Sequence, residues 1–392
     1  MASAGDRGSV EAGHRLIGAG LPADTTARRP GLRYPLLDLL RVVAIGDIVS
    51  IHVADRYLIA GLGLPIFIVT AMALAFRKPA LPAVGPMLGH RGQRVLLPWL
   101  AWSGFYAAGY ALVAGMRPDV RIGQMFNGWM LITGPSVHLW FLPFIVVAEA
   151  VALLVLRRVR AVPVGLVVGG AALLGVVATG LTAELYDRWA SVPVLADHAR
   201  AATDPPWLSS AAGFRRTLWK SWLFGVAGVC FGVAVGRCLG GPSAWPRRLV
   251  LLVALALCGM YWLFAHIGWP SSSGSLPWQW WRQTGALLAV AVAVQVAVHH
   301  RPPGERTPWR DRLFSGPVWS GVRVAGLLTM GVYLLHPWVH SRLRDHLLPL
   351  LPPGLMDRAA DGTRPMAYVA LVWAVTAGAV VLLRRTPVRR VL

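Results

Sequence analysis

Long apolar stretches alternate with short polar connections along most of the 392-residue chain. Each stretch is close to the roughly 20 residues that an α-helix needs to cross the hydrocarbon core of a bilayer. We count about ten such stretches, so the pattern predicts an all-α, polytopic membrane helix bundle. The predicted spans cover residues 36–54, 57–76, 95–115, 137–156, 162–184, 217–239, 248–268, 278–298, 319–340 and 366–384.

The polar segments at the two ends of the chain divide it into three predicted parts. Residues 1–32 are rich in Gly, Ala, Asp and Arg and lack the apolar core of a signal peptide, so we expect a flexible cytoplasmic arm. Residues 33–385 form the predicted transmembrane domain. Residues 386–392 form a basic cytoplasmic tail.

Arginines fall in alternate loops between the predicted spans. The cationic loops lie within residues 77–94, 157–160, 237–248, 301–312 and 384–390. The loops on the opposite side carry mixed charges or none. The positive-inside rule therefore predicts that both termini are cytoplasmic, which agrees with an even number of spans.

The composition narrows the class of protein further. Hydrophobic residues make up 56% of the chain and charged residues only 14%, and the net charge is +21. Because the basic residues lie between apolar blocks, we expect them to face the anionic lipids of a plasma membrane rather than nucleic acid. Three cysteines without CxxC spacing and the absence of an HExxH motif predict neither a disulfide framework nor a metal site.

The first predicted span carries several ionisable side chains, each of which makes insertion of a helix into a membrane more costly. Arg41 and His52 are eleven residues apart, so they share one helix face at an axial separation of about 16 Å. Asp38 can pair with Arg41, and the pair is either functional or a structural link to neighbouring helices. Asp55 either orients His52 or is solvated at the helix end. The sequence suggests no role for Asp47.

Arg91 and Arg94 precede the third predicted span in the segment HRGQRVLLPW. Paired guanidinium groups suit phosphate binding because each presents a planar fork of donors. Ordinary positive-inside loop charge is the alternative interpretation. Neither a GxGxxG nor a Walker A motif is present, so side chains must hold the phosphates of any nucleotide ligand.

Histidines also occur at the edges of two later spans. His138 lies in the segment GPSVHLWFLPF, and Tyr333, His336 and His340 lie in the segment GVYLLHPWVH. Histidine can transfer protons near neutral pH, although a histidine at a membrane edge can equally be a satisfied structural residue.

Taken in order, these segments resemble the membrane acyltransferase-3 family of bacterial O-acyltransferases. The family's LDxLR start and following histidine match Leu37 to Arg41 and His52, and its RxxR matches Arg91 and Arg94. Its HLWFL segment matches residues 138–142, and its YxLWHP-like segment resembles residues 333–337. The resemblance covers roughly residues 33 to 385. The second span differs, because LPIFIVTAMALAF lacks the Ser-Gly pair usual in the family.

The resemblance implies transfer of an acyl group, most often acetyl, from acyl-CoA to a hydroxyl of a carbohydrate or glycosylated acceptor. Arg91 and Arg94 would hold the donor phosphates. Arg41 would hold a deeper part of the donor or stay paired with Asp38. His52 would act as general base on the acceptor hydroxyl.

The resemblance leaves some roles open. Tyr333 or His336 would polarise the acyl carbonyl as a hydrogen-bond donor, and His138 and Trp140 would contact the acceptor. A covalent acyl-histidine is a further possibility. A transporter or flippase for a glycan or small polar metabolite, and a non-catalytic family relative, are the alternatives to an enzyme.

Overall fold

The computed structural model describes residues 34–54, 62–78, 80–116, 134–190, 211–239, 316–347 and 364–391, with shorter pieces at 58, 130 and between 285 and 297. Within these ranges every regular element is helical, which confirms the all-α prediction for this part of the chain. The predicted arm at 1–32, the predicted span at 248–268 and Asp55 lie outside the described residues.

The helices follow the apolar stretches of the sequence closely. Their bounds are α1 Pro35–Ala54, α2 Gly63–Phe76, α3 Val84–Arg91, η1 Gly92–Leu96, α4 Leu97–Met116, η2 Val137–Trp140, α7 Phe141–Arg158, α8 Val164–Ala190, α10 Ala211–Leu239, α14 Pro317–Arg342, η4 Leu343–Leu347, α16 Arg364–Leu383 and η6 Pro387–Arg390. The second helix begins later than expected, at Gly63. The helix predicted at 95–115 is preceded by the π-helical turn η1 and by α3.

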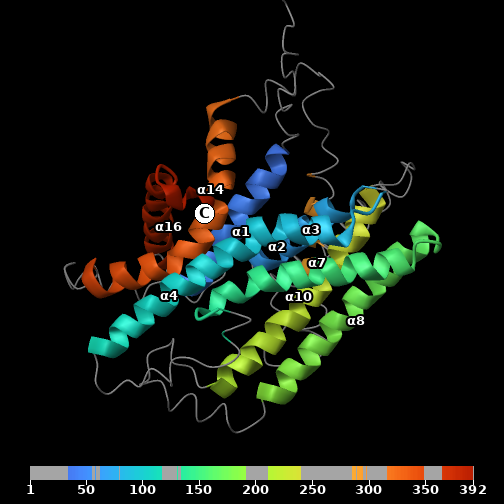
Figure 1. The fold of residues 1–392 in the computed structure, drawn as a ribbon, viewed down its shortest axis with the longest axis horizontal. Helices are drawn as coiled ribbons and strands as arrows, with labels where there is room; N and C mark the ends of the chain where they lie inside the picture. The colour runs from blue at the N-terminus through green and yellow to red at the C-terminus, as the bar shows by residue number, and fades with distance from the viewer. Residues whose placement is uncertain are drawn as a thin grey trace, which may run out of the picture. The chain divides into compact units, whose positions relative to one another are not determined.

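Helix α1 lies at the centre of the described bundle (Figure 1). It packs against α2 on one side and against α14 and α16 on another, while α10 packs against α2 and α8. One apolar core joins α1, α4, α7, α14 and α16, and a second joins α2, α8, α10 and the pieces between 285 and 297. The central helix is therefore also the one that carries the ionisable side chains of the first predicted span.

Glycines on one face of α10 allow it to approach α2 closely. A Cβ atom added at Gly232 would lie 2.5 Å from the Cβ of Met72, and one added at Gly228 would lie 3.0 Å from a side-chain carbon of Ile68. Gly236 continues the row one turn later, against the backbone of α2. This spacing of small residues every four positions is typical of helices that associate in a membrane.

The contact between α1 and α2 explains Asp47, for which the sequence suggested no role. The side chain of Asp47 is buried, and its Oδ2 accepts a hydrogen bond of 2.9 Å from the backbone N–H of Gly63 at the start of α2. A carboxylate is favourable there because the first N–H groups of a helix lack intrahelical partners and carry partial positive charge. Gly63 is also tightly confined, since an added Cβ would lie 2.5 Å from the carbonyl oxygen of Ala44.

Four of the described helical segments are long and apolar enough to cross a membrane: Val84–Leu112, His138–Arg158, Pro317–His346 and Met366–Leu383. Shorter apolar helices include Gly63–Phe76, Val164–Thr179 and Gly225–Leu239. Helix α1 has the necessary length but carries three charged residues. The count of ten spans and the orientation of the termini remain predictions.

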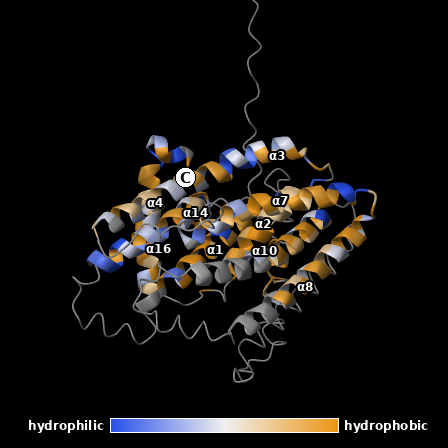
Figure 2. Ribbon diagram, turned by 60° about the horizontal axis from the view of Figure 1, so that its bottom comes forward, coloured by the Kyte–Doolittle hydropathy of each residue, from blue (hydrophilic) through white to orange (hydrophobic). Residues whose placement is uncertain are grey.

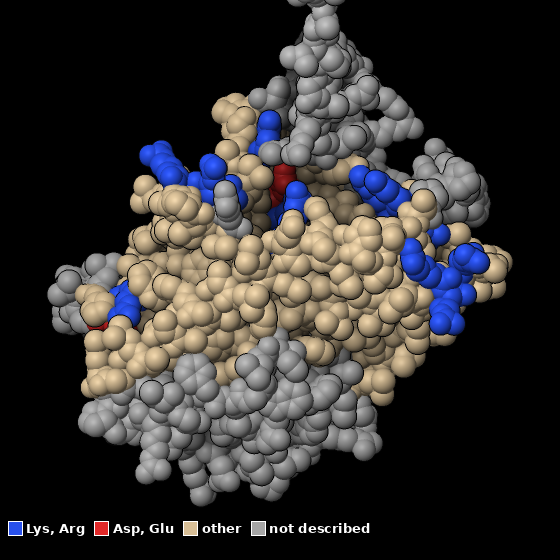
Figure 3. Space-filling model, in the orientation of Figure 1, with Lys and Arg blue, Asp and Glu red and all other residues tan. Residues whose placement is uncertain are grey.

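The surface of the bundle has the character expected for a membrane protein. Apolar residues predominate along the helices in Figure 2. On the face shown in Figure 3, Lys and Arg gather along the upper part and at the left and right ends, and a broad band across the middle carries no charged side chain. Such a band suits contact with lipid.

The predicted basic tail packs against α4. Thr386 caps the short helix η6, and the carbonyl oxygen of Val391 accepts a hydrogen bond of 3.0 Å from the indole N–H of Trp102. Trp102 is itself buried. The tail is thus attached to the bundle by at least this one bond.

Candidate active site

Four of the residues singled out in the sequence come together between α1, α14 and the start of α7. We call His52, His138, Tyr333 and His336 the histidine layer. The ring of His336 lies 5.3 Å from that of His52 and 5.8 Å from that of His138, and the rings of His138 and Tyr333 are 5.6 Å apart. Among the described residues no group of His, Cys, Asp or Glu side chains is placed to hold a metal ion.

His336 is completely buried and is held by its own helix. Its Nδ1 lies 2.9 Å from the carbonyl oxygen of Tyr333 and 3.1 Å from that of Val332. Because carbonyl oxygens only accept hydrogen bonds, Nδ1 carries a proton, and in the neutral ring Nε2 has a free lone pair. This Nε2 is buried and has no hydrogen-bond partner among the described residues.

His138 reaches the layer through a tight turn ahead of η2. Gly134 has a φ of 81°, and a Cβ there would lie 2.8 Å from that of Leu139, so glycine suits this position on both counts. The Oγ of Ser136 is 2.8 Å from Nδ1 of His138 and fixes the ring. The Nε2 of His138 is buried and, like that of His336, lacks a partner within the described part of the chain.

The Tyr333 hydroxyl is already engaged. It donates to the backbone carbonyl of His138 and thereby ties α14 to the turn that carries this histidine. A tyrosine has a single O–H donor, so in this arrangement Tyr333 positions His138 and does not point a donor at a substrate. Trp140 packs against Phe141 and Phe144 in the apolar core.

Arg41 and Asp38 form the expected pair near the start of α1. Their side chains are 3.3 Å apart, and Asp38 is the more buried of the two. A Cβ added at Gly326 of α14 would lie 2.9 Å from the Cβ of Asp38, so α14 passes directly over this carboxylate. The expected pairing is confirmed, and it leaves Arg41 partly exposed.

The two arginines of the RxxR segment occupy different environments. The Nε of Arg91 is 2.6 Å from Oε2 of Glu149, a buried side chain in α7. That oxygen has no aligned hydrogen-bond donor among the described residues, so the contact is an ion pair. Arg94 lies in the π-helical turn η1 and is exposed. A π-helical turn within a helix is an irregularity that often occurs at functional sites.

The ion pairs and the histidines lie at two levels along the helices. Arg41 precedes His52 by eleven residues in α1, and Glu149 follows His138 by eleven residues along η2 and α7. Each separation corresponds to about 16 Å of helix rise. We call Asp38, Arg41, Arg91 and Glu149 the charged layer. The spacing that the sequence predicted within one helix therefore recurs in a second.

Three residues of this site were not identified from the sequence. Ser136 orients His138. Tyr106 lies 5.2 Å from the ring of His138 and donates to the carbonyl of Leu334. Glu149 is an isolated carboxylate in an apolar span. An ionisable residue in such a position often marks a functional site in a membrane protein, so this signal could have identified Glu149 from the sequence.

Comparison with protein families gives one match to the described fold and site. The model of the acyltransferase-3 family, described as an acyltransferase domain, matches residues 34–384. Neither curated proteins nor solved structures give a match. The matched region contains both layers and all the helices from α1 to α16. The chain belongs to the acyltransferase-3 family.

Proposed function

We propose that this acyltransferase moves an acyl group, in the first instance acetyl, from acyl-CoA to a hydroxyl of a carbohydrate or glycosylated acceptor. The observation that carries the proposal is a pair of adjacent buried histidines, each with an unpartnered Nε2, beside the exposed His52. Buried polar atoms normally have a partner, so two nitrogens without a hydrogen-bond partner in the described part of the chain suit a site that receives a ligand.

The histidine layer supplies the groups that this reaction needs. The acceptor oxygen attacks the thioester carbonyl while His52 removes its proton, which a positioned base accelerates by about 10²–10⁴-fold. His138, with its proton on Nε2 and Ser136 donating to Nδ1, stabilises the carbonyl oxygen as it gains charge. The C–S bond then breaks, and the CoA sulfur takes up the proton held by His52.

The charged layer suits the anionic donor. With both termini in the cytoplasm of a plasma-membrane protein, this layer lies toward the compartment that contains acyl-CoA. Arg94 is exposed and free to meet phosphate, and Arg41 is partly exposed beside Asp38. An extended pantetheine arm can cover the roughly 16 Å from there to the histidine layer.

Release of CoA from acetyl-CoA by the purified protein tests this function. A thiol reagent reports free CoA, and extracts of the host envelope and metabolites supply the acceptor. We expect acceptor-dependent release by the wild type, none by His52→Ala, and a raised KM for acetyl-CoA with an unchanged acceptor KM in Arg94→Ala.

The control variant is Arg158→Gln, which removes an exposed cation at the end of α7 and should behave like the wild type. Full transfer by His52→Ala contradicts its role as base. Wild-type protein that releases no CoA with any extract contradicts the enzyme and supports a transporter or flippase.

A further inference from the structure

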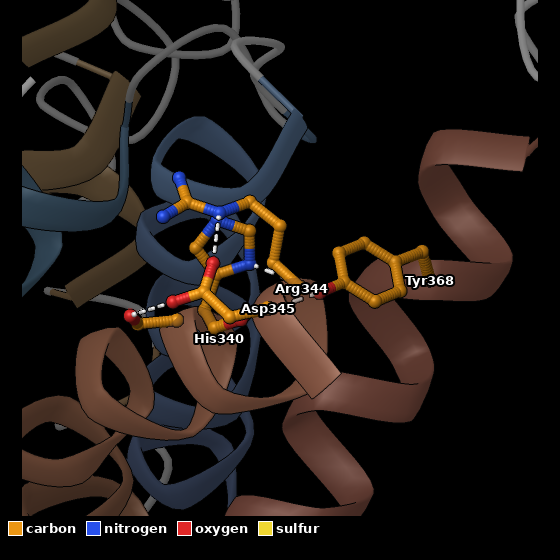
Figure 4. Close-up of polar contacts among 5 residues, drawn as sticks. His340, Arg344, Asp345 and Tyr368 are labelled. Atoms are coloured by element: carbon orange, nitrogen blue, oxygen red, sulfur yellow. Dashed lines mark hydrogen bonds and ion pairs between the residues drawn. The ribbon is translucent and has the colours of Figure 1, made fainter. Parts of the chain in front are cut away.

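A second group of polar side chains lies at the C-terminal end of α14, where it faces α16. We call His340, Ser341, Arg344, Asp345 and Tyr368 the α14–α16 cluster (Figure 4). The Tyr368 hydroxyl is 3.3 Å from Nδ1 of His340 and 3.4 Å from its carbonyl oxygen, and the two rings are 5.7 Å apart.

A carboxylate organises the other half of the cluster. Asp345 accepts a hydrogen bond of 3.0 Å from the Nε of Arg344 on one oxygen and one of 3.2 Å from the hydroxyl of Ser341 on the other. Both Arg344 and Asp345 are nearly half exposed, at 45% and 44% of their side chains. An exposed ion pair of this kind contributes little to stability, so substituting one of its members should leave the fold intact.

The cluster is continuous with the histidine layer. His340 follows His336 by one helical turn on the same face of α14, at a rise of about 6 Å. The charged layer lies in the other direction, because α14 meets Asp38 at Gly326, ten residues before His336. The two polar groups therefore lie on opposite sides of the histidine layer along α14.

The local backbone and the side-chain chemistry both suit a ligand. Arg344 and Asp345 belong to the π-helical turn η4, a second irregularity of the kind found at η1. The cluster combines a carboxylate acceptor, a guanidinium fork, two hydroxyls and an imidazole. This is a mixture of donors and acceptors that can exchange hydrogen bonds with several neighbouring hydroxyl groups at once.

We propose that the α14–α16 cluster is the acceptor subsite, which binds a polyhydroxylated ring and directs one of its hydroxyls toward His336 and His52. The inference rests on the acyl transfer proposed above. It separates the two substrates in space, with the donor entering past the charged layer and the acceptor from the opposite end of α14.

Two conservative substitutions and one neighbouring control test the subsite. Asp345→Asn removes the charge, Tyr368→Phe removes one hydroxyl, and Arg342→Gln removes an exposed cation whose contact is the Trp338 ring at 5.7 Å. Each variant is expressed in a host strain lacking the gene. Acetylated glycans and metabolites are quantified by mass spectrometry, and acetyl-CoA binding to each purified protein is measured by calorimetry.

We expect Asp345→Asn and Tyr368→Phe each to lower the acetylated product by about tenfold or more, as loss of a hydrogen bond to a charged or buried group predicts. Acetyl-CoA affinity and Tm should stay at wild-type values, and Arg342→Gln should transfer normally. Wild-type product levels in both cluster variants, or an equal loss of acetyl-CoA affinity, would overturn the subsite. If the wild type adds no acetylated product to the deletion strain, the proposed function fails as well.

Discussion

At the scale of single residues, the two buried histidines differ in how their ring nitrogens are used. Backbone carbonyls fix the proton of His336 on Nδ1, which leaves its Nε2 as an acceptor. In the proposed transfer Ser136 donates to Nδ1 of His138, and that ring then carries its proton on Nε2. One ring can then receive a proton and the other can donate a hydrogen bond, although both are imidazoles in the same apolar surroundings.

This difference predicts how substitutions of His336 behave. An asparagine amide can reproduce the donor at Nδ1 and keeps no atom at Nε2, so His336→Asn should fold at nearly the wild-type Tm. It should lose about tenfold or more in kcat, because the acceptor hydroxyl loses the Nε2 lone pair that helps to orient it toward His52. Single-turnover rates and thermal unfolding in detergent measure the two effects.

The matched variant is His336→Gln, whose longer amide reaches toward the Nε2 position and leaves the carbonyls of Val332 and Tyr333 without this donor. We expect it to unfold at a lower temperature than His336→Asn. Equal activity of the asparagine variant and the wild type would show that the Nε2 lone pair has no part in transfer.

At the scale of helices, glycine spacing determines how closely the elements pack. The residues Gly228, Gly232 and Gly236 allow α10 to lie against α2 with backbone atoms in contact. Within lipid the hydrophobic effect does not drive helices together, because the lipid tails are as apolar as the side chains. Close van der Waals packing is therefore a main source of helix association. The glycines of α8 that lie over open space, Gly169 and Gly170, have no such role.

Substitution of Gly232 should therefore destabilise the bundle. A Cβ in Gly232→Ala would lie 2.5 Å from that of Met72, which forces the two helices apart at a cost of about 1–3 kcal/mol. We expect a Tm lower by several degrees in thermal unfolding followed by circular dichroism. In Gly170→Ala the added Cβ meets no atom of the described residues within 4 Å. This variant should match or exceed the wild-type Tm, because alanine favours helix over glycine by about 1 kcal/mol. Equal shifts in the two variants would contradict close packing at Gly232.

At the scale of the whole molecule, the sequence predicted the all-helical architecture and most of the helices that the structure describes. Apolar runs of about 20 residues locate helices directly, and the spacing of Arg41 and His52 predicted their separation along α1. The family resemblance named His52, His138 and His336 as site residues, but their ring contacts depend on how helices distant in the sequence pack.

What the sequence did not reveal depends on partners from other helices. Asp47 was unexplained because its role is to bind the first N–H of α2, and the start of α2 was predicted too early. The ion pair of Arg91 was not foreseen because Glu149, its partner in α7, lies 58 positions further along the chain. Both cases concern a charge whose neighbour is fixed only by tertiary packing.

The ion pair of Arg91 and Glu149 attaches the end of α3 to α7, and its loss should affect stability and donor binding together. Arg91 directly precedes the turn that carries Arg94, and Glu149 belongs to the helix that begins beside His138. Glu149→Gln leaves Arg91 without its counter-charge in a partly buried place. Removing one partner of a fully buried pair costs roughly 3–5 kcal/mol. Since Arg91 is about a quarter exposed, we expect a smaller loss of stability, seen as a lower Tm. We also expect a raised KM for acetyl-CoA and an unchanged acceptor KM.

The double variant Arg91→Met with Glu149→Gln should be less destabilised than the sum of the single variants, because it leaves no isolated charge. Additive losses in this cycle would show that the two side chains act independently, and the charged layer would then not hold Arg94 in place through α7.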